Sequence, residues 1–244
     1  HGPDSVRRVV AKAEADRLDL VSQMVLLHAG SSWDGLLVPA FVYFFQKLYP
    51  FARVNDPRSR TAGAAGGCVL VRSDALARAG GIEALRGEVI DDCALGRAVK
   101  RGGPIWLGLS TTERSIRPYR GISDVWNMVA RSAFTQLQHS WWILAGTLLG
   151  LVLLYLVPPL TVLTWPLHRS AAAGALALAT WMLQAFSFAP TLALYGRPAR
   201  WGFALPLAGA LYGAMTIDSA RRHHRREGAL WKGRAGAGCE LELE

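Results

Sequence analysis

Hydrophobic and polar positions divide the chain into two parts. In residues 1–140 short apolar segments alternate with charged turns. In residues 142–217 only Arg169, Arg197 and Arg200 carry a charge. Long uncharged segments of this kind are typical of transmembrane helices, which need about 20 apolar residues. The pattern therefore predicts a polar domain followed by a membrane region.

Helical and strand patterns alternate in residues 1–140, which indicates an α/β fold. The expected elements are a helix from Pro3, a strand over 18–27, a helix over about 36–51, a polar loop over 52–61, a strand and a helix ending at Gly80-Gly81, a helix from Asp91 to Gly102, two short strands over 104–117, and an amphipathic helix over 122–139. Ser73 or Asp74 is expected to cap the helix that ends at the glycine pair. The aromatic-rich helix over 36–51 is too short to span a bilayer and suits the membrane interface, with a buried core helix as the alternative.

Three apolar blocks follow, at about 142–165, 171–195 and 201–217, and a basic tail occupies 218–244. Six Lys and Arg residues in that tail favour a cytoplasmic position. Three crossings would place the tail opposite the domain at 1–140, which is also expected to be cytoplasmic. One block is therefore expected not to cross, and the first is the candidate because Pro158-Pro159 interrupts it.

Composition agrees with a membrane protein. Apolar residues make up 51% of the chain and charged residues 18%, and the formal net charge is +9. The basic residues are scattered or flank apolar blocks, so they are better explained by membrane orientation than by nucleic-acid binding. Three cysteines form no C-x-x-C pair, which supports neither a disulfide framework nor a zinc site.

The most pointed chemical feature is the adjacent pair Asp91-Asp92. Neighbouring carboxylates raise each other's pKa, which suits a general base, whereas a helix N-terminus stabilises both anions. An isolated pair of this kind is more often a helix cap than a catalytic pair. A catalytic role is favoured here because I-D-D-C-A-L follows G-A-A-G-G-C-V-L-V-R and A-G-G-I in that order.

This ordered set resembles the acceptor half of a family 2 glycosyltransferase of GT-A fold. It is closer still to the hopene-associated glycosyltransferases, through V-N-D-P-R, I-R-P-Y-R-G and W-N-M-V-A-R-S-A-F-T-Q-L. The resemblance implies that Asp92 is the general base and that Asp91 is the preceding acidic position. It also implies that Gly66, Gly67 and Cys68 contact the substrates. Arg131 is a further candidate substrate contact, and the alternative for it is a structural arginine at the membrane edge.

The resemblance further implies a nucleotide-sugar donor, a lipid-associated acceptor and a divalent metal, Mg²⁺ or Mn²⁺, held by a D-x-D motif. No D-x-D occurs in the chain. In the family that motif stands just before a segment like residues 1–8, so we expect the metal ligands upstream of His1. The chain is accordingly expected to be the C-terminal half of a GT-A domain, inactive alone.

Other candidate groups favour structural roles. His28 and His139 have no nucleophile motif nearby, and His223-His224 lies within a basic tail. The sequence therefore predicts a multi-pass inner-membrane glycosyltransferase with a cytoplasmic catalytic domain. The alternative is a non-catalytic membrane scaffold whose α/β part binds partners.

Overall fold

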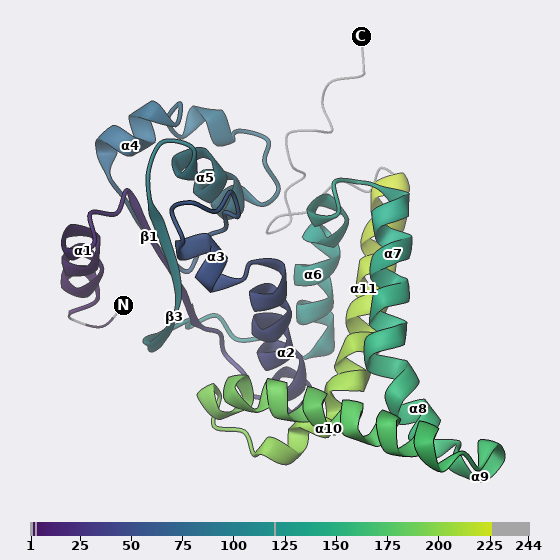
Figure 1. The fold of residues 1–244 in the computed structure, drawn as a ribbon. Coiled ribbons are helices and arrows are strands. Elements are labelled where there is room, and N and C mark those ends of the chain that lie inside the picture. The colour runs from purple at the N-terminus through teal and green to yellow at the C-terminus, as the bar shows by residue number, and fades with distance from the viewer. Residues whose placement is uncertain (1, 3, 120, 226–244) are drawn as a thin grey trace. The chain divides into compact units, whose positions relative to one another are not determined.

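A computed structural model describes residues 2, 4–119 and 121–225. The chain forms two compact units. Unit 1 comprises His1–His28 with Phe44–Pro118, and unit 2 comprises Ala29–Tyr43 with Tyr119–Glu244. The described part is a mixed α/β structure that is mostly helical, as the sequence predicts for the fold class (Figure 1).

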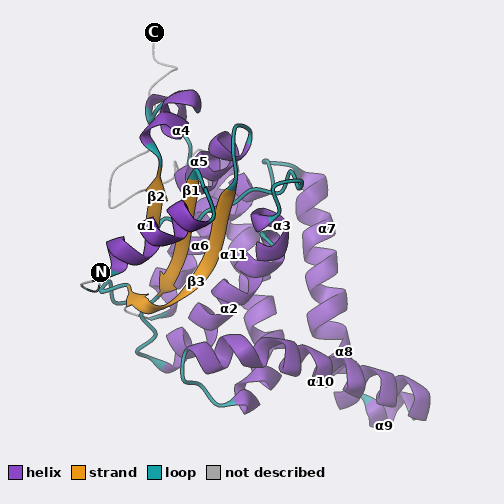
Figure 2. Ribbon diagram, turned by 60° about the vertical axis from the view of Figure 1, so that its left-hand side comes forward, coloured by secondary structure: helices purple, strands orange, loops and turns teal. Residues whose placement is uncertain are grey.

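Unit 1 is built on a three-stranded sheet in the order β2-β1-β3 (Figure 2). The strands are β1 (Leu20–Leu26), β2 (Cys68–Val71) and β3 (Ile105–Arg114). β1 runs antiparallel to β2 and parallel to β3. Side chains on the two faces of β1 alternate, so Val21 and Ser22 point to opposite sides of the sheet.

Helices cover both faces of this sheet. They are α1 (Ser5–Ala15), α3 (Phe51–Asn55), α4 (Ser73–Arg78), the 3₁₀ turn η1 (Glu83–Leu85) and α5 (Asp91–Lys100). α1 lies on one face (Figure 2), where Val9 packs with Leu18 and Val21. The other face receives α5 and the glycine-containing loop that precedes β2. The core of unit 1 is therefore a thin α/β sandwich.

Three local expectations for unit 1 are wrong. Residues 104–117 hold one strand, β3, because the indole of Trp106 occupies the space beside Gly108 and the glycine does not break the strand. The expected loop over 52–61 begins with α3. Arg72 is the N-terminal flanking residue of α4 and makes no side-chain cap, and Asp74 lies inside the helix and pairs with arginines instead.

α2 (Ser32–Leu48) contributes to both units. Nearly every residue from Asp34 to Tyr43 is buried, whereas Leu48 is exposed. The hydroxyl of Tyr212 donates to the carbonyl of Leu37, 2.9 Å away. This burial is what the core-helix alternative expects for the first half of the segment, and interfacial placement of the second half stays a prediction.

Unit 2 is helical. Its elements are α6 (Ile122–Gln136), α7 (Trp141–Leu151), the π-helix η2 (Val152–Leu156), α8 (Val157–Leu163), α9 (Trp165–His168), α10 (Ala171–Leu194), the 3₁₀ helix η3 (Ala199–Ala204) and α11 (Leu205–His224). α6, α7 and α11 lie side by side (Figure 1). Trp126 on α6 donates to Asp218 on α11 at 2.8 Å, and Phe134 packs with Leu144 and Ala220.

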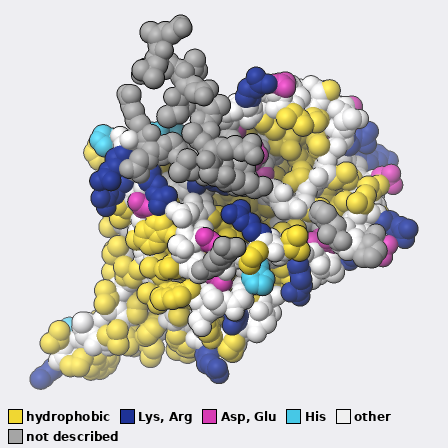
Figure 3. Space-filling view, turned by 180° about the vertical axis from the view of Figure 1, so that it is seen from behind, with side chains coloured by type: hydrophobic (Ala, Val, Ile, Leu, Met, Phe, Trp, Pro, Cys, Tyr) yellow, Lys and Arg dark blue, Asp and Glu magenta, His cyan; other side chains and the backbone are white. Residues whose placement is uncertain are grey.

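Two helical segments in the described residues are long and apolar enough to cross a membrane, Trp141–Leu163 and Ala171–Leu194. The first is not a regular α-helix, because a π-helical turn precedes Pro158-Pro159. Apolar side chains also gather on the surface of unit 2 (Figure 3). The large exposed ones include Trp142, Leu153, Leu163, Leu176 and Phe186. Such a surface gives modest support for membrane association.

Candidate functional site

The start of α5 presents the carboxylate pair. Asp92 accepts a hydrogen bond from the backbone N–H of Gly66 through Oδ2 at 2.7 Å. Its Oδ1 accepts the N–H of Cys93 at 2.7 Å. Asp91 is exposed, and its Oδ1 accepts the N–H of Asp92 at 2.9 Å. The structure thus brings Asp92 together with the glycine loop and leaves Asp91 at the helix end.

The loop of residues 63–67 is held against the sheet and against α5. The hydroxyl of Ser22 accepts the N–H of Ala65 at 2.8 Å and donates to its carbonyl at 3.0 Å. The thiol of Cys93 donates to the carbonyl of Ala64 at 3.3 Å. Three consecutive loop residues are therefore fixed by three side chains of β1 and α5.

Burial and charge shape the carboxyl of Asp92. Partial burial raises its pKa, and the nearby carboxylate of Asp91 adds to that rise, whereas the N–H groups of Cys93 and Gly66 oppose it. The pKa of Asp92 lies above its ordinary value on balance. Because Gly66 and Gly67 are exposed, this carboxyl stands beside an open surface. A raised pKa at an accessible carboxyl suits proton transfer near neutral pH.

Two positions of this loop have little room for a side chain, which explains why they are glycines. A Cβ on Gly67 would lie 2.6 Å from a methyl carbon of Val25, and one on Gly66 would lie 3.3 Å from Oδ2 of Asp92. Cys68 opens β2 and is half-buried, and burial raises the pKa of its thiol. A less nucleophilic thiol fits a contact residue better than a nucleophile.

Arg131 lies on α6 and belongs to unit 2, so its role as a phosphate contact stays a prediction. Sequence reasoning assigned no role to Ser22 or Gly96, which shape the loop. A lone serine within the aliphatic run L-V-S-Q-M-V-L was the available signal for Ser22. A buried hydroxyl in an apolar strand needs a hydrogen-bond partner, and the partner of Ser22 is Ala65 in the loop.

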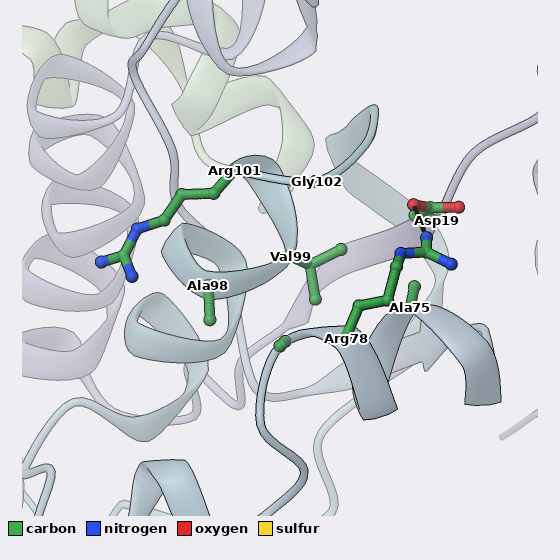
Figure 4. A pocket seen from close by; sticks show the side chains of 8 residues that line it. Asp19, Ala75, Arg78, Ala98, Val99, Arg101 and Gly102 are labelled. Carbon is green, nitrogen blue, oxygen red and sulfur yellow. Dashed lines mark hydrogen bonds and ion pairs between the residues drawn. The ribbon is translucent and has the colours of Figure 1, made fainter.

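A cavity of about 250 Å³ lies in unit 1 at the opposite end of α5 (Figure 4). Its lining includes Asp19, Arg78 and Arg101. Arg78 pairs with Asp19 at 2.7 Å and with Asp74 at 2.9 Å. The hydrogen bonds from Arg78 and then from Arg72 lower the pKa of Asp74 to about 2. The cavity is thus bordered by a satisfied ion-pair network and does not include Asp92.

No group of three or more His, Cys, Asp or Glu side chains that could hold a metal ion occurs in the part of the chain that the structure describes. The described residues therefore contain no three-ligand site for the divalent metal that the resemblance implies. Such an ion is usually held by one or two carboxylates together with substrate phosphates. The resemblance assigns those carboxylates to a D-x-D motif upstream of His1, so the metal site stays a prediction.

Comparison with known proteins identifies a family. A family model described as glycosyl transferase family 21 matches residues 1–226. No curated protein and no solved structure is significantly similar to the chain. The match extends over all of the described residues, including the loop beside Asp92 and the apolar helices. A glycosyltransferase is thus confirmed, although family 2 and the hopene-associated group are finer than the match supports. The chain belongs to glycosyl transferase family 21.

Proposed function

We propose that the chain forms the acceptor side of a membrane-bound, inverting glycosyltransferase of GT-A type, with Asp92 as its general base. The observation that carries this proposal is the position of Asp92. Its carboxyl has a raised pKa, is fixed by two backbone N–H groups and stands beside an exposed glycine loop. Family membership supplies the reaction class, glycosyl transfer.

In the proposed step, a hydroxyl of the acceptor gives its proton to the carboxylate of Asp92. The acceptor oxygen bonds to the anomeric carbon of the donor while the bond from that carbon to the nucleoside diphosphate breaks. The electron pair leaves with the diphosphate. A single displacement of this kind inverts the anomeric centre. Each oxygen of Asp92 keeps a lone pair beyond its bond to a backbone N–H, so it can accept the proton.

The donor is proposed to be a nucleotide sugar, because a diphosphate is a good leaving group. A lipid-associated acceptor is proposed because two helical segments of the same chain are long and apolar enough for a bilayer. An acceptor from a hopanoid pathway and a cytoplasmic site at the inner membrane follow from the resemblance. A Mg²⁺ or Mn²⁺ ion is likewise a proposal from the resemblance.

The test replaces each carboxylate by its amide in the protein expressed from its complete gene. Membranes are incubated with a panel of UDP- and GDP-sugars, and release of nucleoside diphosphate is measured with added lipid extract. Asp92→Asn is expected to lower the rate about 10²–10⁴-fold, because the amide cannot accept the proton. Asp91→Asn is expected to cost less. Asp74→Asn, which removes a surface carboxylate, is the matched control.

The alternative function is a membrane scaffold in which the pair only caps α5. The bonds from the N–H groups of Asp92 and Cys93 to these carboxylates favour that alternative. Retention of full activity in both amide variants would support it. Loss of activity in Asp91→Asn with retention in Asp92→Asn would move the base by one residue.

A further inference from the structure

Ser22 lies beneath the glycine loop at the centre of unit 1. Its side chain is fully buried in β1, and both hydrogen-bonding capacities of the hydroxyl go to one residue, Ala65. Ala65 is itself buried and immediately precedes Gly66. The next N–H along the loop is the one that reaches Asp92. Because the hydroxyl of Ser22 holds both the N–H and the carbonyl of Ala65, it also fixes the direction of the next N–H, that of Gly66.

We propose that Ser22 is a positioning residue, which holds the loop so that the N–H of Gly66 meets the carboxylate of Asp92. The inference deepens the proposed function and rests on Asp92 being its base. Ser22 is fully buried and its hydroxyl bonds to Ala65, so we infer that it acts on Asp92 through the loop. The strand supplies the hydroxyl, the loop transmits its position, and α5 supplies the carboxylate.

The physical consequence is a specific change of charge state. The N–H of Gly66 favours the ionised carboxyl, so its loss should raise the pKa of Asp92 further. Among the described residues, the titratable groups that act on this carboxyl are Asp91 and the thiol of Cys93, and that thiol is faced by Tyr49 and Arg97. The loop of residues 63–67 contains glycine and alanine only and brings no charge. A displaced loop therefore changes the hydrogen bond without adding another charge.

Labelling by dicyclohexylcarbodiimide tests this without knowledge of the substrate. The reagent adds to protonated carboxyl groups, so the pH dependence of labelling at Asp92, located by peptide mass spectrometry, follows its protonation. In Ser22→Ala we expect the labelling midpoint to move to higher pH. Ser22→Thr keeps the hydroxyl and is expected to retain the wild-type midpoint.

Ser110→Ala is the matched control. Ser110 is also a buried serine of the same sheet, but its hydroxyl accepts the N–H groups of Thr112 and Glu113 and does not touch the loop. This variant should leave the Asp92 midpoint unchanged. Should Ser22→Ala not fold, Ser22→Cys offers a weaker hydrogen-bonding group of similar size and is expected to move the midpoint in the same direction.

An unchanged midpoint in a folded Ser22→Ala or Ser22→Cys protein would overturn the inference, as would an equal shift in Ser110→Ala. Failure of the proposed function has a different signature. In that case Asp92→Asn would retain transferase activity, whatever the labelling midpoint does. If Asp92→Asn is inactive and the midpoint does not move, only the role of Ser22 is refuted.

Discussion

Glycine at position 96 lets α5 touch the backbone of the loop that carries Gly66. A Cβ at this position would lie 3.0 Å from the carbonyl carbon of Gly63 and 3.2 Å from the nitrogen of Ala64. In the same loop, a Cβ on Gly63 would meet the ring of Tyr49 at 2.5 Å. Backbone cannot rotate away as a side chain can, so the close approach of α5 and of that ring leaves the loop little room to move.

Replacement of Gly96 by alanine should therefore push the loop away from α5. Overpacking of this kind costs about 1–3 kcal/mol, equal to about 5- to 150-fold more frequent local opening. Cys93 reports on it, because burial raises the pKa of its thiol to about 11 and makes it unreactive in the closed state. Alkylation of Cys93, followed by peptide mass spectrometry, should accelerate within that range.

Gly102→Ala is the control for this variant. The nearest atoms to a Cβ at Gly102 are 3.9 Å away, and the residue follows the same helix. Alkylation of Cys93 should stay at the wild-type rate in this variant. Equal rates in Gly96→Ala and the wild type would show that the loop has room to move, against the packing described above.

At the scale of elements, α1 is fastened to the end of β3 by a buried carboxylate. Glu113 is 3% exposed and accepts hydrogen bonds from the hydroxyl of Ser5 at 2.6 Å and from the N–H of Gly2 at 3.2 Å. The bond from Ser5 is the main cause that lowers the pKa of Glu113 below its ordinary value of 4.5. The ionised form therefore links the start of α1 to the sheet.

This link should depend on pH. Because the folded pKa is the lower one, the carboxylate stabilises the folded state above pH 4.5, and the contribution disappears as the pH falls through the folded value. Glu113→Gln should raise hydrogen exchange of the α1 amides several-fold at pH 7. The difference from wild type should vanish below the folded pKa.

Glu83→Gln is the comparison for this experiment, since Glu83 pairs with Arg86 on the surface and does not touch α1. Its α1 amides should exchange as in the wild type at every pH. A Glu113→Gln effect that persists unchanged into acid would mean that the ionised carboxylate is not what fastens α1.

Local sequence signals were sufficient to predict most helices and strands but not the contacts between them. Periodicity and glycine stops predicted α1, α5 and α6 closely, and both glycines at 80–81 adopt the left-handed conformation that ends α4. They failed at β3, because two short strands were expected over 104–117 and the structure has one, Ile105–Arg114. That expectation could not include the indole of Trp106, because one-dimensional patterns do not show which side chain fills a space.

At the candidate site, too, local sequence signals indicated some residues, whereas a contact between distant segments could not be predicted. The order of glycines and carboxylates along the chain indicated Asp92 and Gly66, and the structure brings these two residues together. Ser22 is 44 residues from Gly66 and belongs to a strand whose register with β2 sets its position. Such a contact depends on the pairing of strands that are distant in sequence, so only the folded chain could show it.

At the scale of the whole molecule, unit 2 constrains how the chain can cross a membrane. The rings of His139 and His223 stack with centroids 4.2 Å apart, and the rings of Trp141 and His224 are 6.4 Å apart. The start of α7 and the end of α11 therefore lie together. Two neighbouring chain ends must be on one side of a bilayer, so the path between them crosses it an even number of times.

The sequence favoured the first block as the one that does not cross, but among the described residues Trp141–Leu163 and α10 are the two segments with sufficient length and apolarity. We therefore predict two crossings, by these two segments, and reaction at Arg200 alone would instead support the first expectation. Single cysteines at His139, Arg169, Arg200 and His223 in a cysteine-free background would be labelled in intact cells with an impermeant maleimide. Only the cysteine at Arg169 should react from outside, because charge bias places the basic tail in the cytoplasm. The double variant His139→Cys/His223→Cys should form a disulfide on oxidation.

The labelling pattern separates the possible errors. Reaction at both Arg169 and Arg200 would preserve the even number but assign the crossings to α7 and α11, with α10 lying along the surface. Labelling of only one of positions 139 and 223, with no disulfide in the double variant, would mean three crossings and would contradict the stacked histidines. The predicted pattern would instead place the basic residues at the end of α11 on the same face of the membrane as the start of α7, where the anionic headgroups of the cytoplasmic leaflet attract them.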